Sequence, residues 1–342
     1  MKALYVKGKF QFQVRDVTLR DIEPDEVLLK VSACGFCGSE IFIAQDAKEW
    51  QPIGHEVSGR VEKIGSMVKN VKVGDQVVVE SGSYDRFSDL SRNGHYDLDN
   101  SGRHFFNRDA EAAGMGMAEY VIAPAETCVP YEGMSLAAAC LIEPMGVAYD
   151  MIKVADIQLD DDVMIVGTGA IGLMALRLAK LRGAGHIYAV NRSGRDYRDE
   201  IALKWGADAV IHNDVEDINA YPFPNGGVDK ILFTTPPRIM PDFLDVLKVA
   251  GNMTFIGKEA DEGPGVYATF DMNKIHIKKL QIRSSFAAPA LFFPACIKLY
   301  KEGKIDLDAL YTHDLHLDTF EKDFWNFMND RAKGIKAILF ND

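Results

Sequence analysis

Four side chains are of the types that hold a catalytic zinc ion. Cys37 offers a thiolate, His55 an imidazole, and Glu56 and Glu143 offer carboxylates. Catalytic zinc takes three protein ligands of these kinds and keeps one position open. There the metal polarises an alcohol or carbonyl oxygen and lowers the pKa of a hydroxyl group. Residue type alone leaves a second interpretation open, because a histidine before a glutamate is commonly a surface or satisfied polar pair.

A glycine-rich turn is the second chemical signal. It comprises Gly167, Thr168, Gly169, Ala170, Ile171 and Gly172. The apolar run 162–166 before it predicts a buried strand, and the spacing of apolar residues after it predicts a helix. In such a turn the glycines allow a tight bend, close approach of a pyrophosphate and close helix–strand packing, and the helix N-terminus attracts the phosphates. An ordinary glycine turn is the alternative, but this context favours a dinucleotide site.

The residues after the next expected strand, 186–190, bear on the choice of cofactor. They include Asn191, Arg192, Ser193 and, further on, Arg198. NAD enzymes usually place an acidic residue about 20 residues past the glycines, where it holds the ribose hydroxyls. Arg192 can instead pair with a 2′-phosphate, and Ser193 can donate to it. We therefore expect NADP(H) to be preferred over NAD(H); a solvated face at a helix start is the alternative.

The elements around this turn alternate between strand and helix patterns. Further strands are expected at 208–211, 228–235, 252–256 and 280–286. A helix is expected from Pro241 through Val249, with proline at a tolerated first-turn position. This alternation predicts an α/β fold with an open, doubly wound, mostly parallel sheet. Thr234 and Thr235, at the end of the fourth strand, complete the predicted cofactor-binding residues.

The flanking segments have the patterns of β structure. Strands are expected at 1–6, 26–31, 54–65 and 71–79, and a closing strand at 337–340. Later helices are expected at 294–301 and 320–328. Residues 81–117 are polar and aperiodic, which predicts a long loop or lobe, and loops of that length are usually functional.

Composition limits the partners and the compartment. A chain of 342 residues predicts two domains. The net charge of -12 argues against nucleic acid or an anionic membrane surface as a partner, and no apolar run approaches membrane-spanning length. Five cysteines, an odd number, favour a reducing compartment over a disulfide framework. We therefore expect a cytoplasmic protein that acts on small molecules.

The ordered motifs resemble those of the zinc-dependent medium-chain dehydrogenases, with the sorbitol (polyol) dehydrogenase branch nearest. The similarity runs essentially from end to end. It rests on the segments 37–40, 54–65, 74–75, 143–144 and 167–172. The resemblance implies a GroES-like β-barrel catalytic domain at 1–147, completed by 287–342, and a Rossmann NAD(P)-binding domain at 148–286.

The resemblance also implies roles for single residues. Cys37, His55 and Glu143 would hold the catalytic zinc, with Glu56 as a ligand or exchange partner. Ser39 would receive the hydroxyl proton of the substrate, and Glu40 would orient His55. The implied enzyme is a zinc-dependent alcohol or polyol dehydrogenase that passes hydride from a secondary alcohol of a polyol or sugar-like molecule to NADP⁺. Relatives of this type are usually homodimers or homotetramers.

The cysteines depart from the family pattern. Many relatives hold a structural zinc through four closely spaced cysteines, whereas residues 81–117 contain none. We therefore expect one catalytic zinc ion per chain and no structural zinc. The remaining cysteines are expected to be buried small apolar residues, and they are Cys34, Cys128, Cys140 and Cys296.

Two further departures concern the proton route and the substrate. Phe42 stands where relatives often have a histidine that passes the proton to solvent, so His95 or His104 is the candidate for another route. The segment 287–293 is largely apolar, whereas polyol dehydrogenases tend to carry a polar, arginine-bearing segment there. The identity of the substrate therefore stays open.

Three other functions stay open at this point. Aldose oxidation of the glucose dehydrogenase kind is one, because residues 191–192 resemble the NADP site of that branch. A zinc-free quinone or enone reductase would share the architecture, but such enzymes lack the set formed by Cys37, His55 and Glu143. A non-catalytic NADPH-binding protein would bind cofactor without metal or turnover.

Overall fold

The computed structural model describes every residue except 100, 103–109, 258–265, 288–290 and 342. Contacts divide the chain into two units. The first unit comprises Met1–Gly146, Ala287–Asp330 and Lys336–Asp342, and the second comprises Val147–Phe286 and Arg331–Ile335. Residues 331–335 therefore pack with the second unit, although the sequence analysis assigned them to the catalytic domain.

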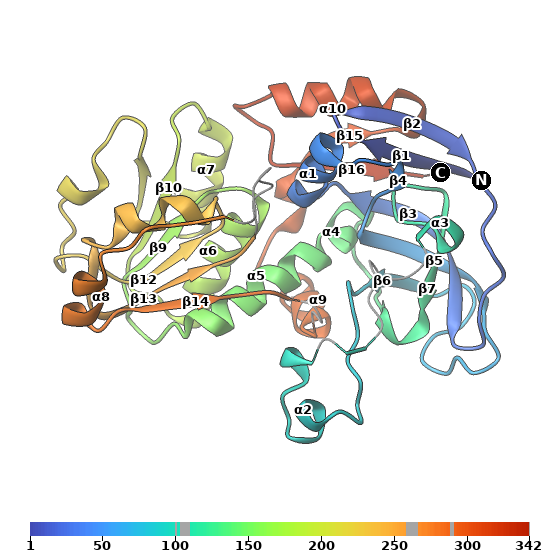
Figure 1. The fold of residues 1–342 in the computed structure, drawn as a ribbon, viewed down its shortest axis with the longest axis horizontal. Coiled ribbons are helices and arrows are strands. Elements are labelled where there is room, and N and C mark those ends of the chain that lie inside the picture. The colour runs from blue at the N-terminus through green and yellow to red at the C-terminus, as the bar shows by residue number, and fades with distance from the viewer. Residues whose placement is uncertain (100, 103–109, 258–265, 288–290, 342) are drawn as a thin grey trace. The chain divides into compact units, whose positions relative to one another are not determined.

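The second unit is built on a parallel sheet (Figure 1). Its described residues form six strands in the order β11 (Ala209–His212), β10 (Ile187–Asn191), β9 (Val163–Val166), β12 (Val228–Phe233), β13 (Leu247–Phe255) and β14 (Gln281–Ser284). All neighbouring strands are parallel. The chain starts at β9 and winds outward in both directions, which is the doubly wound order of the Rossmann fold. Every residue of β9 and β10 is buried, as their apolar sequences predict.

Helices follow most of these strands. The α-helices are α5 (Ile142–Ala155), α6 (Ala170–Arg182), α7 (Asp196–Trp205) and α8 (Met272–Lys278), and the 3₁₀ helices are η3 (Ile218–Ala220) and η4 (Pro237–Phe243). α6 begins after Gly169 and ends at Gly183, whose φ of 104° is in the left-handed region that favours glycine.

The predicted helix from Pro241 through Val249 is wrong. The chain forms the 3₁₀ helix η4, which ends at Phe243, and β13 then begins at Leu247. Leu247 pairs with Val228 of β12, and Ala250 has a φ of 64°, which a helix does not contain. Pairing with a neighbouring strand therefore outweighs the local helical pattern.

The first unit contains two sheets that share one apolar core, which is the arrangement expected of the GroES-like fold. Among the described residues, the larger sheet has the order β15 (Tyr311–Leu315), β16 (Lys336–Phe340), β3 (Glu26–Gly35), β5 (Glu56–Ile64), β6 (Gln76–Val79) and β8 (Cys128–Pro130), with β7 (Tyr120–Pro124) beside β3. The smaller sheet has the order β2 (Gln11–Asp16), β1 (Lys2–Lys7) and β4 (Gln51–Pro52). Valine and leucine side chains from several of these strands share one apolar core.

The helices of the first unit are short. The α-helices are α1 (Gly38–Asp46), α2 (Asp89–Arg92), α3 (Ala110–Ala113), α4 (Leu136–Cys140), α9 (Phe293–Lys301) and α10 (Phe320–Asn329). The 3₁₀ helices are η1 (Tyr96–Leu98), η2 (Ala125–Thr127), η5 (Leu307–Leu310) and η6 (Leu317–Thr319). α10 packs Phe320 and Phe324 against Phe12 and Phe36. A helix long and apolar enough to cross a bilayer is absent from the part of the chain described.

One buried carboxylate organises the segment that was expected to be a loop or lobe. Asp99 is buried and accepts hydrogen bonds from the hydroxyl groups of Ser88, Ser91 and Ser101 and from the backbone N–H of Ser101. The bonds from Ser101 and Ser88 hold the pKa of Asp99 below its usual range. A carboxylate with serine donors thus ties this segment together at a place where the sequence offers no cysteine.

Candidate active site

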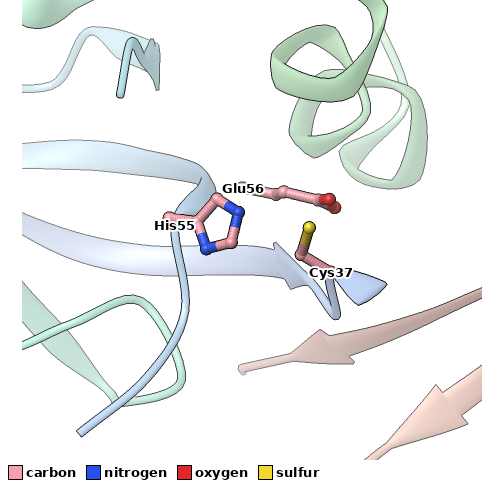
Figure 2. Close-up of side chains that lie close together, drawn as sticks. All are labelled: Cys37, His55 and Glu56. Atoms are coloured by element: carbon pink, nitrogen blue, oxygen red, sulfur yellow. The ribbon is translucent and has the colours of Figure 1, made fainter. Parts of the chain in front are cut away.

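Three of the four predicted metal ligands lie together in the first unit. Cys37 is the N-cap of α1, His55 directly precedes β5, and Glu56 is the first residue of β5. Their donor atoms all lie within 4.8 Å of one another. Figure 2 shows the Glu56 carboxylate beside the Cys37 sulfur, with both on the same side of the imidazole ring. The antiparallel pairing of β3 with β5 places Gly35 opposite Glu56, which brings these segments together.

Glu40 connects the two segments that carry the ligands. Its Oε1 lies 3.0 Å from His55 Nδ1 and accepts a 2.8 Å bond from Gly54 N–H. Its Oε2 accepts a 3.1 Å bond from Cys37 N–H, as in the capping boxes that begin many helices. Because Nδ1 is held by Glu40, Nε2 is the histidine nitrogen left for a metal. The contact that the resemblance implied between Glu40 and His55 is present.

Glu56 is held by a residue from the far end of the chain. Lys336 Nζ donates to Glu56 Oε1 in a buried ion pair across 280 sequence positions. The other oxygen, Oε2, is buried and has no hydrogen-bond partner among the described residues. A Cβ atom at Gly35 would lie 2.0 Å from Oε2, so only glycine leaves room for the carboxylate. The contact of Lys336 with Glu56 was not predicted, because no local sequence pattern signals so distant a pair.

The electrostatics of the cluster fit a cation. Burial lowers the pKa of His55, but the negative charges of Cys37 and Glu40 outweigh burial and hold that pKa well above its usual value. Sulfur and carboxylate donors thus lie around the imidazole, and Glu56 Oε2 has no hydrogen-bond donor among the described residues. Sulfur, nitrogen and oxygen ligands together are typical of zinc rather than of magnesium or calcium. The residues present therefore fit a zinc ion.

Glu143, the fourth predicted ligand, lies beside this cluster. It is buried in the first turn of α5. Burial raises its pKa to about 7, while the charge of His55 lowers that pKa and the charge of Glu56 raises it. These influences place Glu143 near the cluster, although its carboxylate is outside the group of donor atoms that lie within 4.8 Å of one another.

The other residues predicted for the catalytic unit are more varied in position. Ser39 is half-buried in the first turn of α1, and His95 is exposed in the segment that Asp99 organises. His104 lies outside the described residues, as does part of the apolar segment 287–293. Cys34, Cys128, Cys140 and Cys296 are buried free thiols, which confirms that expectation.

The glycine turn of the second unit has the shape that a dinucleotide needs. Gly167 has a φ of 99°, and a Cβ atom at Gly172 would lie 1.9 Å from the Gly167 carbonyl oxygen. At Gly169 a Cβ atom would meet no described atom within 4 Å, so the turn faces open space where a phosphate can approach. The hydroxyls of Thr168 and Thr235 are buried without a partner among the described residues. These orphaned hydroxyls and the open turn fit a nicotinamide dinucleotide.

Residues predicted to bind a 2′-phosphate have other partners in the structure. Arg198 is half-buried and donates to the Gly334 carbonyl, with a 3.0 Å bond from Nε. Ser193 donates its N–H and its hydroxyl to Asp214, at 2.8 Å and 2.7 Å. Asn191 donates to Asp199 at 3.1 Å. Asp214 was not predicted, because it lies in the loop after β11, 21 positions beyond Ser193. Its position just past that strand is the one signal that the sequence offers.

Arg192 keeps the environment expected of an anion-binding residue. Its side chain is exposed, and its charge acts on the guanidinium of Arg195. Burial lowers the pKa of Arg195, and the charges of Arg331 and Arg192 lower it further. Arg192 and Arg331 thus both lie close enough to Arg195 for their positive charges to act on it.

Comparison with known proteins agrees with this geometry. Residues 23–133 match the family model of the alcohol dehydrogenase GroES-like domain, and residues 170–302 match that of the zinc-binding dehydrogenase. The chain is 30% identical to (R,R)-butanediol dehydrogenase of Bacillus subtilis over 359 aligned positions, which cover 99% of each protein. The chain therefore belongs to the zinc-binding alcohol dehydrogenases of the medium-chain, polyol dehydrogenase-like type.

Solved structures share the fold over the whole chain. The dehydrogenase RspB of Escherichia coli CFT073, in complex with NADH, has a TM-score of 0.87 at 23% identity and covers 100% of this chain and 99% of its own. A zinc-binding dehydrogenase of Sinorhizobium meliloti, bound to NADP, has a TM-score of 0.85 at 22% identity and covers 99% of each chain. The family thus uses zinc and a nicotinamide cofactor, and it acts on small-molecule alcohols.

Proposed function

We propose that this protein transfers hydride between a secondary alcohol of a polyol or sugar-like substrate and NADP(H). One observation carries the proposal. The donor atoms of Cys37, His55 and Glu56 lie together, and Glu56 Oε2 has no hydrogen-bond partner among the described residues. One zinc ion per chain would be held by Cys37, His55 and Glu143, with Glu56 as a ligand or exchange partner. The similarity to a dehydrogenase of butanediol supports a substrate with neighbouring hydroxyl groups.

When bound, zinc supplies a Lewis acid for the substrate oxygen, and the nicotinamide supplies a two-electron acceptor for hydride. Ser39 Oγ would accept the proton that the substrate hydroxyl loses and would pass its own hydroxyl proton on toward solvent. Glu40 keeps His55 in one tautomer and one orientation, since its carboxylate holds Nδ1. Lys336 fixes Glu56 Oε1 and leaves Oε2 as the available donor atom. The net reaction would convert the secondary alcohol into a ketone, with the nicotinamide supplying the hydride acceptor and one proton released to solvent.

NADP(H) is proposed as the preferred cofactor because of Arg192. Its guanidinium is exposed beside Arg195 in the turn where a 2′-phosphate would lie. The cofactor itself would bind at residues 167–172, with Asn191, Arg192, Ser193 and Arg198 near the ribose. The hydroxyls of Thr168 and Thr235, which have no partner among the described residues, support the same site, and Thr234 donates to the Gly167 carbonyl oxygen.

The test begins with zinc content and turnover of freshly purified protein. We expect close to one zinc ion per chain, with NADP⁺-dependent oxidation in a screen of polyols and aldoses. Cys37→Ala should abolish turnover and spare cofactor binding, since it removes a ligand from one unit only. Cys128→Ala is the matched control, because Cys128 is a buried cysteine that is expected to leave zinc and turnover intact. Retained turnover in Cys37→Ala, or cofactor binding by a protein that takes up no zinc, would refute the proposal.

We propose further that the enzyme is a cytoplasmic homodimer or homotetramer. Ile282 supports association, because it is exposed on β14, the last strand of this sheet among the described residues, and edge strands invite pairing. All five cysteines are free thiols, which supports a reducing compartment. Light scattering of the purified protein measures the first point, and a monomer would contradict it.

A further inference from the structure

The turn after β10 is hydrogen-bonded to a carboxylate from the loop that follows β11. Asp214 follows β11, and it accepts both the N–H and the hydroxyl of Ser193, 21 positions earlier in the chain. β10 and β11 are adjacent and parallel, with Asn191 opposite His212. Their carboxyl ends therefore open at the same edge of the sheet, where the ribose end of a dinucleotide binds. The end of β10 carries no acidic residue, and Asp214, from the loop after β11, places a carboxylate there instead.

Asp214 occupies the donors that a 2′-phosphate would need. A hydroxyl and a backbone N–H side by side are well suited to an anion. A phosphate monoester carries nearly two negative charges at neutral pH. To use Ser193, this phosphate must displace a carboxylate whose pKa the two Ser193 donors already lower. Asp214 is exposed, so it meets the phosphate as a charged group.

Arg192 and Asp214 act in opposite directions on one turn. Arg192 directly precedes Ser193 and attracts a 2′-phosphate, whereas Asp214 repels it. A ribose with a free 2′-hydroxyl has no such conflict, because a carboxylate can accept a hydrogen bond from it. The charge at position 214 therefore matters for one cofactor and much less for the other.

We propose that Asp214 determines cofactor specificity by disfavouring nucleotides with a 2′-phosphate, and so limits the preference for NADP(H) that Arg192 produces. The proposal rests on the proposed role of this turn in cofactor binding. Removal of the charge at Asp214 frees the Ser193 donors and removes the repulsion. Both changes favour the 2′-phosphate.

Equilibrium binding tests this role without turnover. Calorimetry on the zinc-loaded, full-length protein would compare adenosine 2′,5′-bisphosphate with adenosine 5′-monophosphate, which differ only in the 2′-phosphate. We expect Asp214→Asn to bind the bisphosphate about tenfold more tightly and the monophosphate within about twofold of wild type. Equal dissociation constants for the bisphosphate in wild type and variant would overturn the proposal. Unchanged monophosphate binding shows that the variant is folded.

Asp217→Asn is the matched control. It removes the same charge from the same loop, where Asp217 caps η3 by accepting a hydrogen bond from Asn219 N–H. Its bisphosphate affinity should match wild type. Equal tightening by both variants would mean that net charge is responsible, and the proposal would fail. At about 1 M salt the effect of Asp214→Asn should shrink, because exposed charges are screened.

Ser193→Ala tests whether Asp214 really withholds the hydroxyl. In the wild-type background this change should alter bisphosphate affinity by less than about twofold, since the hydroxyl is already engaged. In the Asp214→Asn background it should remove much of the gain, which is the non-additivity expected of contacting residues. An equal loss in both backgrounds would overturn the claim.

The proposed cofactor preference is judged by a separate measurement. The wild-type ratio of kcat/KM for NADP⁺ to that for NAD⁺ tests it. A ratio below one refutes the NADP(H) preference, and a tighter bisphosphate complex of Asp214→Asn would still support the role of Asp214. The two failures are therefore distinguishable.

Discussion

The metal-ligand cluster and the turn after β10 both depend on carboxylates that accept hydrogen bonds, but they differ in burial. Glu40 and Glu56 are each 1% exposed, whereas Ser193 and Asp214 are open to solvent. In the buried cluster every charge must have a partner, because desolvation of an unpaired charge costs several kcal/mol. At the exposed turn, water can replace any partner that is lost, and single contacts contribute little to stability.

This difference assigns different tasks to the two regions. The buried cluster cannot lose a charged partner without a large loss of stability, which suits a site that must hold a metal in one geometry. At the exposed turn, a side chain can change its charge or its hydrogen-bond partner without unfolding the protein. This tolerance suits a site that selects between similar cofactors. Substitutions in the two regions should therefore differ in their effect on stability.

Lys336→Met should have the largest effect. The change leaves the Glu56 carboxylate buried without its cation, so the free energy of unfolding of the zinc-free protein should fall by about 3–5 kcal/mol. Added zinc should recover part of the loss, because the metal binds only the folded protein. Chemical unfolding with and without a chelator measures both quantities.

The double variant Lys336→Met with Glu56→Gln is the control for that prediction. It removes both charges and should be more stable than the single variant, since no buried charge stays unpaired. A single variant as stable as wild type would remove the contrast between the two regions.

Glu40→Gln should have an intermediate effect. Glutamine keeps the shape but offers one acceptor oxygen in place of two, so His55 and the Cys37 segment lose a shared anchor. Zinc affinity should fall about 10–100-fold, as measured by competition with a chromophoric chelator. Glu62→Gln is the control. It also removes one negative charge, at a more exposed position on β5, and it should leave zinc affinity unchanged. An equal loss in both would mean that overall charge, not anchoring, governs affinity.

Arg192→Ala should have the smallest effect on stability. The free energy of unfolding should stay within about 0.5 kcal/mol of wild type, as for other exposed side chains. The dissociation constant for adenosine 2′,5′-bisphosphate should rise about tenfold, because one guanidinium is lost. Calorimetry with the two nucleotides provides the measurement. An equal rise for the 5′-monophosphate would show that Arg192 does not act on the 2′-phosphate.

Several features of the fold were predictable because they depend on neighbouring residues. The apolar run before Gly167 predicts a buried strand, and β9 is buried throughout. The β-rich and α/β patterns predict the two kinds of fold, and the four cysteines expected to be buried are buried. The segment from Pro241 to Val249 was misjudged, since short apolar runs fit helix and strand alike. There the pairing of Leu247 with Val228 determined the outcome.

The sequence by itself determined the chemical types at the site: a thiolate, an imidazole and carboxylates in a fixed order, and a glycine turn between a strand and a helix. Tertiary structure alone decided which charged residues from distant parts of the chain bind the residues of these two sites. Lys336 reaches Glu56 through strand pairing at the far end of the chain, and Asp214 reaches Ser193 because two parallel strands end at one edge. Neither contact leaves a local pattern, because both arise from sheet register rather than from sequence neighbours.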